Sequence, residues 1–177
     1  MSENINQNKD MSRAEDSALV AAYVRKMFGR DPSELQLSRI MVKLRHTGYL
    51  KDGVDRRFLK NKLLIEQLTL LMSTSDADIR EKRYFLTDEN GKQKMSQEKG
   101  TLGGYQGMHI YGKLDCRSAL RHLALGHYAP SRVFFADEAT AISAGYRPCG
   151  VCMREKYLVW KANEAKQQGN SSKEGDA

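Results

Sequence analysis

The N-terminal half of the chain alternates apolar and polar residues with the period of an α-helix. Over residues 13–28, apolar side chains recur every three to four positions with charged residues between them, which predicts a first helix. A second helix is predicted to begin with Asp31 as its N-cap and Pro32 at its first position, and to end at Thr47-Gly48. A leucine stripe predicts a third helix over residues 57–72. This half is therefore predicted to be mainly helical.

The second half of the chain carries the signals of short strands. Asn90-Gly91 lies between two segments with strand character, so a β-hairpin is predicted near residues 83–96. After a glycine-rich passage, residues 109–116 and 132–135 are predicted as strands, with a short helix over residues 117–125 between them. The fold class predicted from these patterns is α+β.

Changes in composition divide the chain into four predicted parts. Residues 1–12 and 164–177 are polar and lack periodicity, so both are predicted to be disordered tails. Residues 13–100 form a mainly helical, basic region that includes the hairpin, and residues 101–163 form a small C-terminal module. A chain of 177 residues can bury one sizeable core, so the smaller module would need a staple such as a metal ion.

Charge and hydropathy narrow the classes of partner. The formal net charge of +7 and the isoelectric point near 9.3 favour an acidic partner such as nucleic acid, because Lys and Arg neutralise phosphates. No apolar run approaches the roughly 18–20 residues that a transmembrane helix needs, and the N-terminal segment lacks the apolar core of a signal peptide. We therefore expect a cytoplasmic protein with no membrane partner.

The three cysteines lie close together in the second half of the chain. Cys149 and Cys152 are separated by two residues and follow a Gly and a Pro, which favours a tight turn with both sulfurs on one side. Cys116 lies upstream, with three of the four histidines nearby. In a reducing compartment, a Cys-x-x-Cys motif indicates a metal or redox site rather than a disulfide framework. We predict one bound zinc ion as the cofactor.

Two blocks around these cysteines resemble a known family. The long block runs from Phe134 to Cys152 and ends in Gly-Tyr-Arg-Pro-Cys-x-x-Cys; the short block is Ile110-Tyr111-x-x-x-x-Cys116. Both are similar to the metal-binding domain of the bacterial DNA-repair protein Ada and its stand-alone relatives. The resemblance covers about residues 108–161. It implies a bacterial protein with a small zinc module and a connection to DNA.

The resemblance also implies a set of zinc ligands. In that family, four ligands hold one zinc ion. Two early ligands lie upstream in the chain with three residues between them, and the late pair comes from the Cys-x-x-Cys. Carried over to this chain, the late pair is Cys149 and Cys152, and the second early ligand is Cys116. The first early ligand falls on Gly112, which has no side chain to bind a metal. In the family this first cysteine accepts a methyl group from a DNA phosphotriester, so we assign no catalytic residue and favour a non-enzymatic protein.

A histidine is the expected replacement for the fourth ligand, because structural zinc is tetrahedral. An ungapped alignment backward from Phe134 places His122 at the second early ligand, which makes it the leading candidate for a Cys3His site. His127, in the loop before the next strand, is the alternative, and His109 is the third. The other interpretation of a histidine on a helix is a packed or surface residue.

Basic residues in both halves are candidates for nucleic-acid contact. The N-terminal helices and a basic turn are compatible with a winged-helix-like module, in which one helix enters the major groove. Arginines near the cysteines could clamp a phosphate, Arg132 among them. The alternative is that the charges mark a solvated helix face and that Arg147 pairs with Asp137 or Glu138. The contact candidates are Arg39, Lys43, Arg45, Arg117, Arg121 and Arg147.

Three functional hypotheses follow from these observations. The first is a zinc-binding protein that binds nucleic acid, DNA rather than RNA, through basic surfaces, with zinc in a structural role. The second is a zinc-stabilised protein-interaction module that does not bind nucleic acid. The third is an alkyl-accepting DNA-repair protein that uses Cys116.

Overall fold

The structure, a computed structural model, describes the backbone of residues 2–81 and 83–171 and the side chains of residues 11–81 and 83–166. Helices make up most of the N-terminal half, and two small sheets follow, which confirms the α+β class. The chain forms two compact units. Unit 1 comprises residues 1–84 and 93–97, and unit 2 comprises residues 85–92 and 98–177. Each unit is described by itself below.

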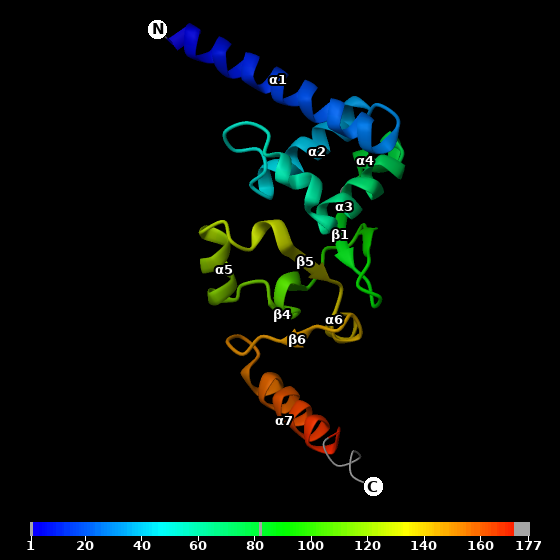
Figure 1. The fold of residues 1–177 in the computed structure, drawn as a ribbon, viewed down its shortest axis with the longest axis vertical. Coiled ribbons are helices and arrows are strands. Elements are labelled where there is room, and N and C mark those ends of the chain that lie inside the picture. Colours follow the sequence, from blue (N-terminus) through cyan, green and yellow to red (C-terminus); the bar gives the residue numbers. More distant parts are fainter. Residues whose placement is uncertain (1, 82, 172–177) are drawn as a thin grey trace. The chain divides into compact units, whose positions relative to one another are not determined.

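Unit 1 is a small helical assembly (Figure 1). Its elements are α1 (Ser2–Phe28), α2 (Glu34–His46), the 3-10 helix η1 (Arg56–Lys60), α3 (Lys62–Ser73) and α4 (Asp76–Arg80). The apolar stripes of α1, α2 and α3 meet in a core in which every side chain is almost fully buried. This core includes Val20, Val24, Ile40, Leu44, Leu64 and Leu68. The ring of Tyr23 packs edge-on against that of Phe58, with centroids 5.9 Å apart, so η1 is joined to α1.

The start of α2 differs from the prediction. The N-cap is Ser33 rather than Asp31: its hydroxyl accepts a hydrogen bond from the Gln36 N–H, and the Gln36 side chain accepts one from the Ser33 N–H. This reciprocal capping box satisfies two otherwise orphaned donors, which a lone Asp-Pro start does not. Asp31 instead accepts a hydrogen bond of 2.6 Å from the Arg25 Nε.

Two helices extend into segments that were predicted to be disordered. Helix α1 begins at Ser2 instead of residue 13, and α7 (Arg154–Ser171) continues past residue 164. Extending an existing helix avoids the cost of nucleation, and Glu, Gln and Lys are good helix formers, so a polar segment can continue a helix without an apolar stripe. Residues 172–177 of the predicted tail lie outside the described residues.

The third predicted helix is interrupted. Its first turn is the separate 3-10 helix η1, and Asn61 then caps α3 by accepting a hydrogen bond from the Leu64 N–H. Asn is one of the best N-cap residues, so the chain starts a new helix at this point instead of continuing the old one. Within the described part of the chain, no helix is both long enough and apolar enough to span a bilayer.

The predicted hairpin is present as β1 (Tyr84–Thr87) and β2 (Gln93–Ser96), which confirms the Asn-Gly turn. Gly91 has a φ of 76°, a left-handed conformation that glycine adopts without steric cost. The Asp88 carboxylate accepts hydrogen bonds from two backbone N–H groups of the turn. The division between the two units falls within this hairpin.

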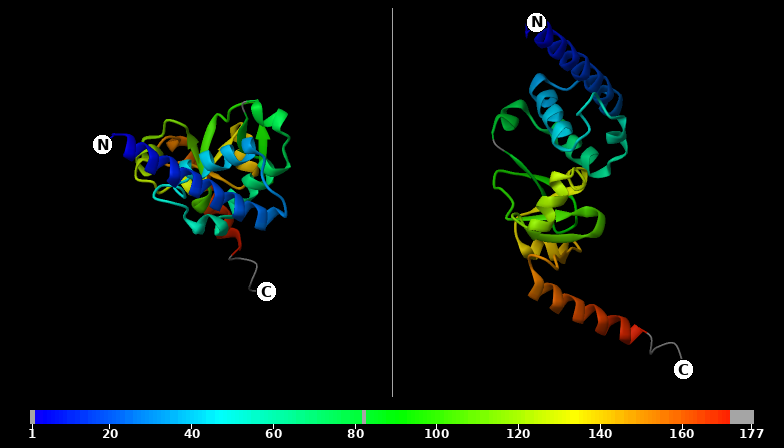
Figure 2. Two further views of the ribbon diagram at one scale, coloured as in Figure 1. Left: turned by 90° about the horizontal axis from the view of Figure 1, so that it is seen from above. Right: turned by 90° about the vertical axis from the view of Figure 1, so that its left-hand side faces the viewer.

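Unit 2 is built on a four-stranded sheet with the strand order β5-β3-β4-β6. Its chain runs from green to red in the ribbon views of Figure 2. The strands are β3 (Leu102–Tyr105), β4 (Ile110–Lys113), β5 (Arg132–Phe135) and β6 (Arg147–Pro148). Strand β3 is antiparallel to β4 and β5, and β6 is parallel to β4. Helix α5 (Arg117–Ala124) connects β4 to β5, α6 (Glu138–Ser143) connects β5 to β6, and α7 follows β6.

One face of this sheet forms the core of unit 2. Tyr111, Val133 and Phe135 are buried on it and pack with Ala141 of α6 and with Tyr146. The rings of Phe135 and Tyr146 meet edge to face, with centroids 4.8 Å apart.

The other face of the sheet carries glycine in its centre and arginine on its outer strands. Gly103 and Gly112 are paired across β3 and β4. The neighbouring row across the sheet consists of Arg132, Tyr105, Ile110 and Arg147. Paired residues point to the same side of a sheet, so this face combines a row with two adjacent glycines and a row with an arginine at each end.

Candidate metal centre

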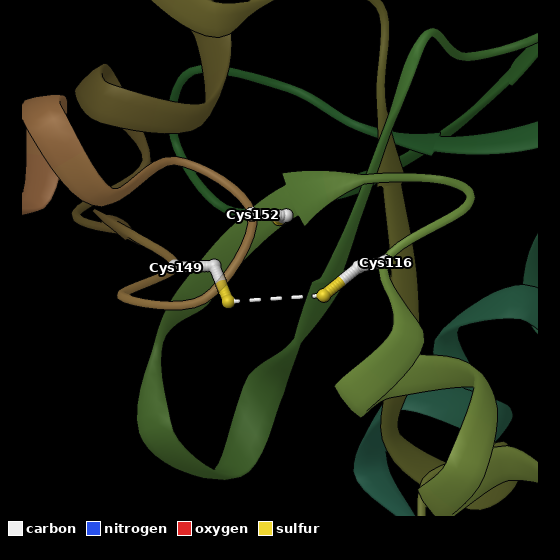
Figure 3. A group of neighbouring side chains, drawn as sticks. All are labelled: Cys116, Cys149 and Cys152. Carbon is white, nitrogen blue, oxygen red and sulfur yellow. Dashed lines mark hydrogen bonds between the residues drawn. The ribbon is translucent and has the colours of Figure 1, made fainter.

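The sulfur atoms of the three cysteines converge in unit 2. Cys116 follows β4 and precedes α5, Cys149 follows β6, and Cys152 lies in the turn before α7. All three Sγ atoms lie within 4.8 Å of one another, and those of Cys116 and Cys149 are 3.9 Å apart (Figure 3). Zinc–sulfur bonds of about 2.3 Å in a tetrahedron place sulfur atoms about 3.8 Å apart. The three sulfurs therefore fit three corners of a zinc site.

Backbone hydrogen bonds to β4 hold the Cys-x-x-Cys turn. The Cys149 N–H donates to the Tyr111 carbonyl at 2.8 Å, which extends the parallel pairing of β4 and β6 by one residue. The Lys113 N–H donates to the Cys152 sulfur at 3.4 Å. Strand β4 thus positions both sulfurs of the motif, and its last residue also donates to one of them.

The three thiols have an electrostatic reason to bind a cation. Burial acts to raise the pKa of Cys149, but the N–H groups of Cys152 and Val151 stabilise its thiolate and hold its pKa below the ordinary value. Burial raises the pKa of Cys152 to about 12, and the adjacent sulfurs of Cys116 and Cys149 add to that increase. Three thiolates this close repel one another, and a divalent cation removes that repulsion.

Gly112 lies directly against the sulfur cluster. A Cβ atom at this position would stand 2.7 Å from the Cys152 Sγ and 3.0 Å from the Cys149 Cβ. Real Cβ atoms do not approach other atoms so closely, so the sulfurs occupy space that any side chain at this position would need. The position that the resemblance equates with the first ligand therefore faces the cluster but contributes no donor.

The structure does not bring the candidate histidines to the sulfurs. In the described part of the chain, the group of side chains that could hold a metal contains the three cysteines and no histidine. The His122 ring stacks on the Tyr128 ring, with centroids 4.6 Å apart and 13° between the planes, and the exposed His127 ring lies 6.1 Å from that of His122. His109 packs near Tyr146. A histidine as the fourth ligand remains a prediction.

A pocket of about 310 Å3 opens beside the cluster. Gly103 and Gly112 belong to its lining, together with the cysteines Cys116 and Cys149. Its charged lining includes Arg132 and Arg147. The pocket lining therefore combines two cysteines, two arginines and the two paired glycines of the sheet.

Two stacked tyrosines form another part of the pocket lining. The rings of Tyr105 and Tyr128 lie 4.3 Å apart with 8° between their planes, and His122 stacks on the far side of Tyr128. Neither tyrosine was predicted to be a site residue. They are 23 positions apart in the sequence and belong to no motif, so only the pairing of β3 with β5 could have indicated that they meet.

The side chain of Arg132 has a buried hydrogen-bond donor without an acceptor in the described part of the chain. Its guanidinium lies over Gly103, where any Cβ atom would overlap it, and also over the Phe134 ring at 5.5 Å from the centroid. Its Nε is buried and has no hydrogen-bond partner among the described residues. Burial lowers the pKa of Arg132, while the nearby Cys116 sulfur acts in the opposite direction.

Arg147 does not take the predicted ion pair with Glu138. Its guanidinium lies over the rings of Tyr157 and Trp160, at 5.5 and 5.3 Å from their centroids. Glu138 instead forms an ion pair with Lys156 and accepts a hydrogen bond of 2.8 Å from the Tyr111 hydroxyl. The contacts of Arg147 thus attach α7 to β6.

The other contact candidates have different surroundings. Arg117 and Arg121 are exposed and lie one turn apart on α5. In unit 1, Arg45 is exposed, Arg39 donates to the Ile79 carbonyl at 3.2 Å, and burial lowers the pKa of Lys43 to about 8. A partly desolvated lysine is a poor site for a phosphate, so α5 presents a better basic surface than α2 does.

Comparison of the chain with protein-family models, curated proteins and solved structures gives no match. The case for a function therefore depends on the three sulfurs, the pocket beside them and the charges around it.

Proposed function

We propose that unit 2 is a zinc-binding module in which Cys116, Cys149 and Cys152 hold one zinc ion. The observation that carries this proposal is the convergence of three Sγ atoms within 4.8 Å. Thiolates are favoured ligands of zinc, and the spacing of the sulfurs suits tetrahedral coordination. The resemblance to the Ada metal-binding domain adds support, because it equates the same three residues with zinc ligands.

The role proposed for zinc is structural. The ligands come from two segments that are 33 residues apart, so one ion would tie the start of α5 to the turn before α7. Binding energy of this kind is folding energy in small zinc modules. We also propose a cytoplasmic location, because a reducing compartment keeps the thiols free for the metal.

Metal analysis of the purified protein tests the zinc proposal. We expect one zinc ion per chain after dialysis against metal-free buffer without added thiols. The absence of stoichiometric metal after refolding with zinc would contradict the proposal. Refolding with zinc removes the trivial explanation that the metal was lost during purification.

We further propose that the partner is nucleic acid, DNA in preference to RNA. The net charge of +7 and the exposed pair Arg117 and Arg121 on α5 support this proposal. Contacts of this kind release counterions, so affinity should fall steeply as the salt concentration rises. A winged-helix-like role for the helices of unit 1 remains a prediction.

Fluorescence anisotropy with labelled DNA and RNA of equal length tests the second proposal. The double variant Arg117→Gln/Arg121→Gln should lower the slope of log affinity against log salt by up to about 1.8 for duplex DNA. The matched control Lys161→Gln/Lys166→Gln removes two exposed charges from α7 and should leave the slope nearly unchanged. If the zinc-loaded protein binds neither nucleic acid, the protein-interaction hypothesis takes the place of this one.

The alkyl-accepting alternative has less support. Only 4% of the Cys116 surface is exposed, and the family's acceptor position is Gly112. A thiolate that is both buried and shared with a metal ion is a poor nucleophile for a bulky DNA substrate. A mass increase of Cys116 after incubation with methyl-phosphotriester DNA would restore this alternative.

A further inference from the structure

Three sulfurs leave one corner of a tetrahedral zinc site without a protein donor, and that corner has a specific place in unit 2. Zinc sites with three protein ligands take the fourth ligand from solution. Gly112 faces the cluster with no side chain, and it lines the pocket together with Cys116 and Cys149. If the proposed metal is bound, a ligand from solution can therefore reach it through this pocket.

The pocket prefers a ligand that carries negative charge. Its charged lining residues, Lys113, Arg132 and Arg147, are all cationic. A guanidinium group binds a carboxylate through charge-assisted hydrogen bonds, so a carboxylate is the favoured charged group of such a ligand. The volume of about 310 Å3 limits the ligand to a small molecule.

A metal ion held by the three cysteines prefers sulfur as its fourth donor. Three thiolates make a soft site, and a fourth thiolate completes the tetrahedron that closed zinc–cysteine sites adopt. The added negative charge of such a ligand is offset by the positive charge of the arginines that line the pocket. The metal site would thus recognise the sulfur of the ligand, and the arginines of the same pocket would recognise its carboxylate.

We propose that this pocket binds a small thiol that carries a carboxylate group, with its sulfur beside the three cysteine sulfurs and its carboxylate on Arg132. This inference rests on the proposed zinc site. Binding is a ligand exchange without oxidation: the thiol S–H bond breaks, the proton leaves to solvent, and the sulfur takes the place of a water molecule as fourth donor. The pocket keeps that position accessible, and Arg132 selects the carboxylate.

Cobalt-substituted protein provides a direct test, because sulfur-to-cobalt charge-transfer bands report the number of bound thiolates. The probe is 3-mercaptopropionate; the controls are propionate, which lacks the thiol, and 2-mercaptoethanol, which lacks the carboxylate. We expect the probe to raise the charge-transfer absorbance by about one third, as four thiolates replace three. Propionate should not raise it, and 2-mercaptoethanol should bind about tenfold more weakly than the probe.

Two variants test the roles of Arg132 and Gly112 separately. Arg132→Gln should weaken binding of 3-mercaptopropionate about tenfold and leave that of 2-mercaptoethanol unchanged. The control Arg80→Gln removes an exposed guanidinium that does not line the pocket and should change neither. Gly112→Ala places a methyl group 2.7 Å from the Cys152 Sγ position, so it should displace this ligand and weaken cobalt binding itself. If this variant binds no cobalt, Arg132→Gln alone decides.

Different results would overturn the ligand inference and the metal site on which it rests. Cobalt that binds to the wild-type protein without any response to 3-mercaptopropionate would overturn the ligand inference and leave the metal site standing. Equal affinity for the probe and 2-mercaptoethanol would overturn the role of Arg132. A protein that binds no cobalt and no zinc would refute the metal site itself. Gel filtration after each titration establishes that the thiol has not extracted the metal.

Discussion

The thiolate of Cys152 depends on a nearby cation, because burial and the neighbouring sulfurs raise the pKa of this thiol to about 12. A metal ion supplies the positive charge that makes its thiolate stable. We predict that Cys152→Ser lowers zinc affinity by more than about 100-fold, since even residues that only support metal ligands contribute 10–100-fold. Competition with a zinc-responsive chelator dye measures this change.

The histidines provide controls for that variant. His127→Ala should retain full zinc affinity because its side chain is exposed and outside the sulfur group. His122→Ala should also retain the metal and lose only its stacking on Tyr128. Loss of zinc from His122→Ala would show that this side chain reaches the metal in solution, and it would contradict an open fourth position.

Glu138 contributes stability that depends on pH. Its hydrogen bonds with Lys156 and the Tyr111 hydroxyl hold the pKa of the carboxyl below its ordinary 4.5. Because the pKa is lower in the folded state, this stability is present above about pH 4.5 and is lost as the pH falls through the folded-state pKa. We predict that Glu138→Gln costs about 1 kcal/mol or less at pH 7, as the pair is partly exposed.

Urea unfolding of zinc-loaded protein across the range from pH 3 to 7 tests this prediction. The difference between the wild type and Glu138→Gln should shrink as the pH falls below about 4.5. Glu155→Gln, which removes an exposed charge from the first turn of α7, is the control. A difference that grows toward low pH would mean that the protonated carboxyl is the stabilising form.

At the scale of elements, the start of α2 is the clearest case in which two sequence signals compete. Asp31-Pro32 and Ser33 both precede the helix, and the reciprocal hydrogen bonds with Gln36 favour Ser33. We predict that Ser33→Ala destabilises unit 1 by about 1 kcal/mol. Asp31→Ala should cost less, because it removes only an exposed ion pair with Arg25.

Chemical denaturation of the two variants under the same conditions decides between the caps. The order of unfolding midpoints should be wild type, Asp31→Ala and then Ser33→Ala. The reverse order of the two variants would assign the cap to Asp31, and it would show that the hydrogen bonds at Ser33 contribute little in solution.

The helices and strands that could be predicted are those marked by signals between neighbouring residues. Helical periodicity located the first two helices of unit 1, and Asn90-Gly91 located the hairpin, because these signals act over a few neighbouring residues. The break at Asn61 was missed because the leucine stripe lies wholly after Asn61 and does not mark the residue at which the helix begins. The helical ends of α1 and α7 were missed because polar residues that extend a helix leave no apolar pattern.

The candidate site was predictable only in part. The Cys-x-x-Cys motif and the concentration of cysteines indicated the three-sulfur group, and spacing within the sequence was enough for that. The pocket depends on strand register: Gly103 meets Gly112, and Tyr105 meets Arg132, only because β3 pairs with both neighbours. Register is a tertiary property, so no single segment of the sequence contains it.

At the scale of the whole molecule, the two units differ in what stabilises them. The helices of unit 1 share an apolar core, whereas unit 2 has a smaller core beside the sulfur cluster. We predict that removal of zinc with a chelator destabilises unit 2 and leaves the helices of unit 1 folded. Trp160, the single tryptophan, lies in unit 2 and reports on it selectively.

Two readouts on one chelated sample test this difference. Tryptophan fluorescence should change on chelation and recover when zinc is added in excess, while most of the helical circular-dichroism signal should persist. Simultaneous loss of both signals would show that the units unfold together. An unchanged fluorescence melting curve would show that zinc does not stabilise unit 2.

The most direct test of the three-sulfur zinc site is zinc-edge X-ray absorption of the protein in buffer without thiols. The account predicts one zinc ion per chain with three sulfur neighbours at about 2.3 Å and one lighter neighbour. Zinc surrounded by oxygen and nitrogen alone, or no stoichiometric zinc in protein refolded with the metal, would contradict it.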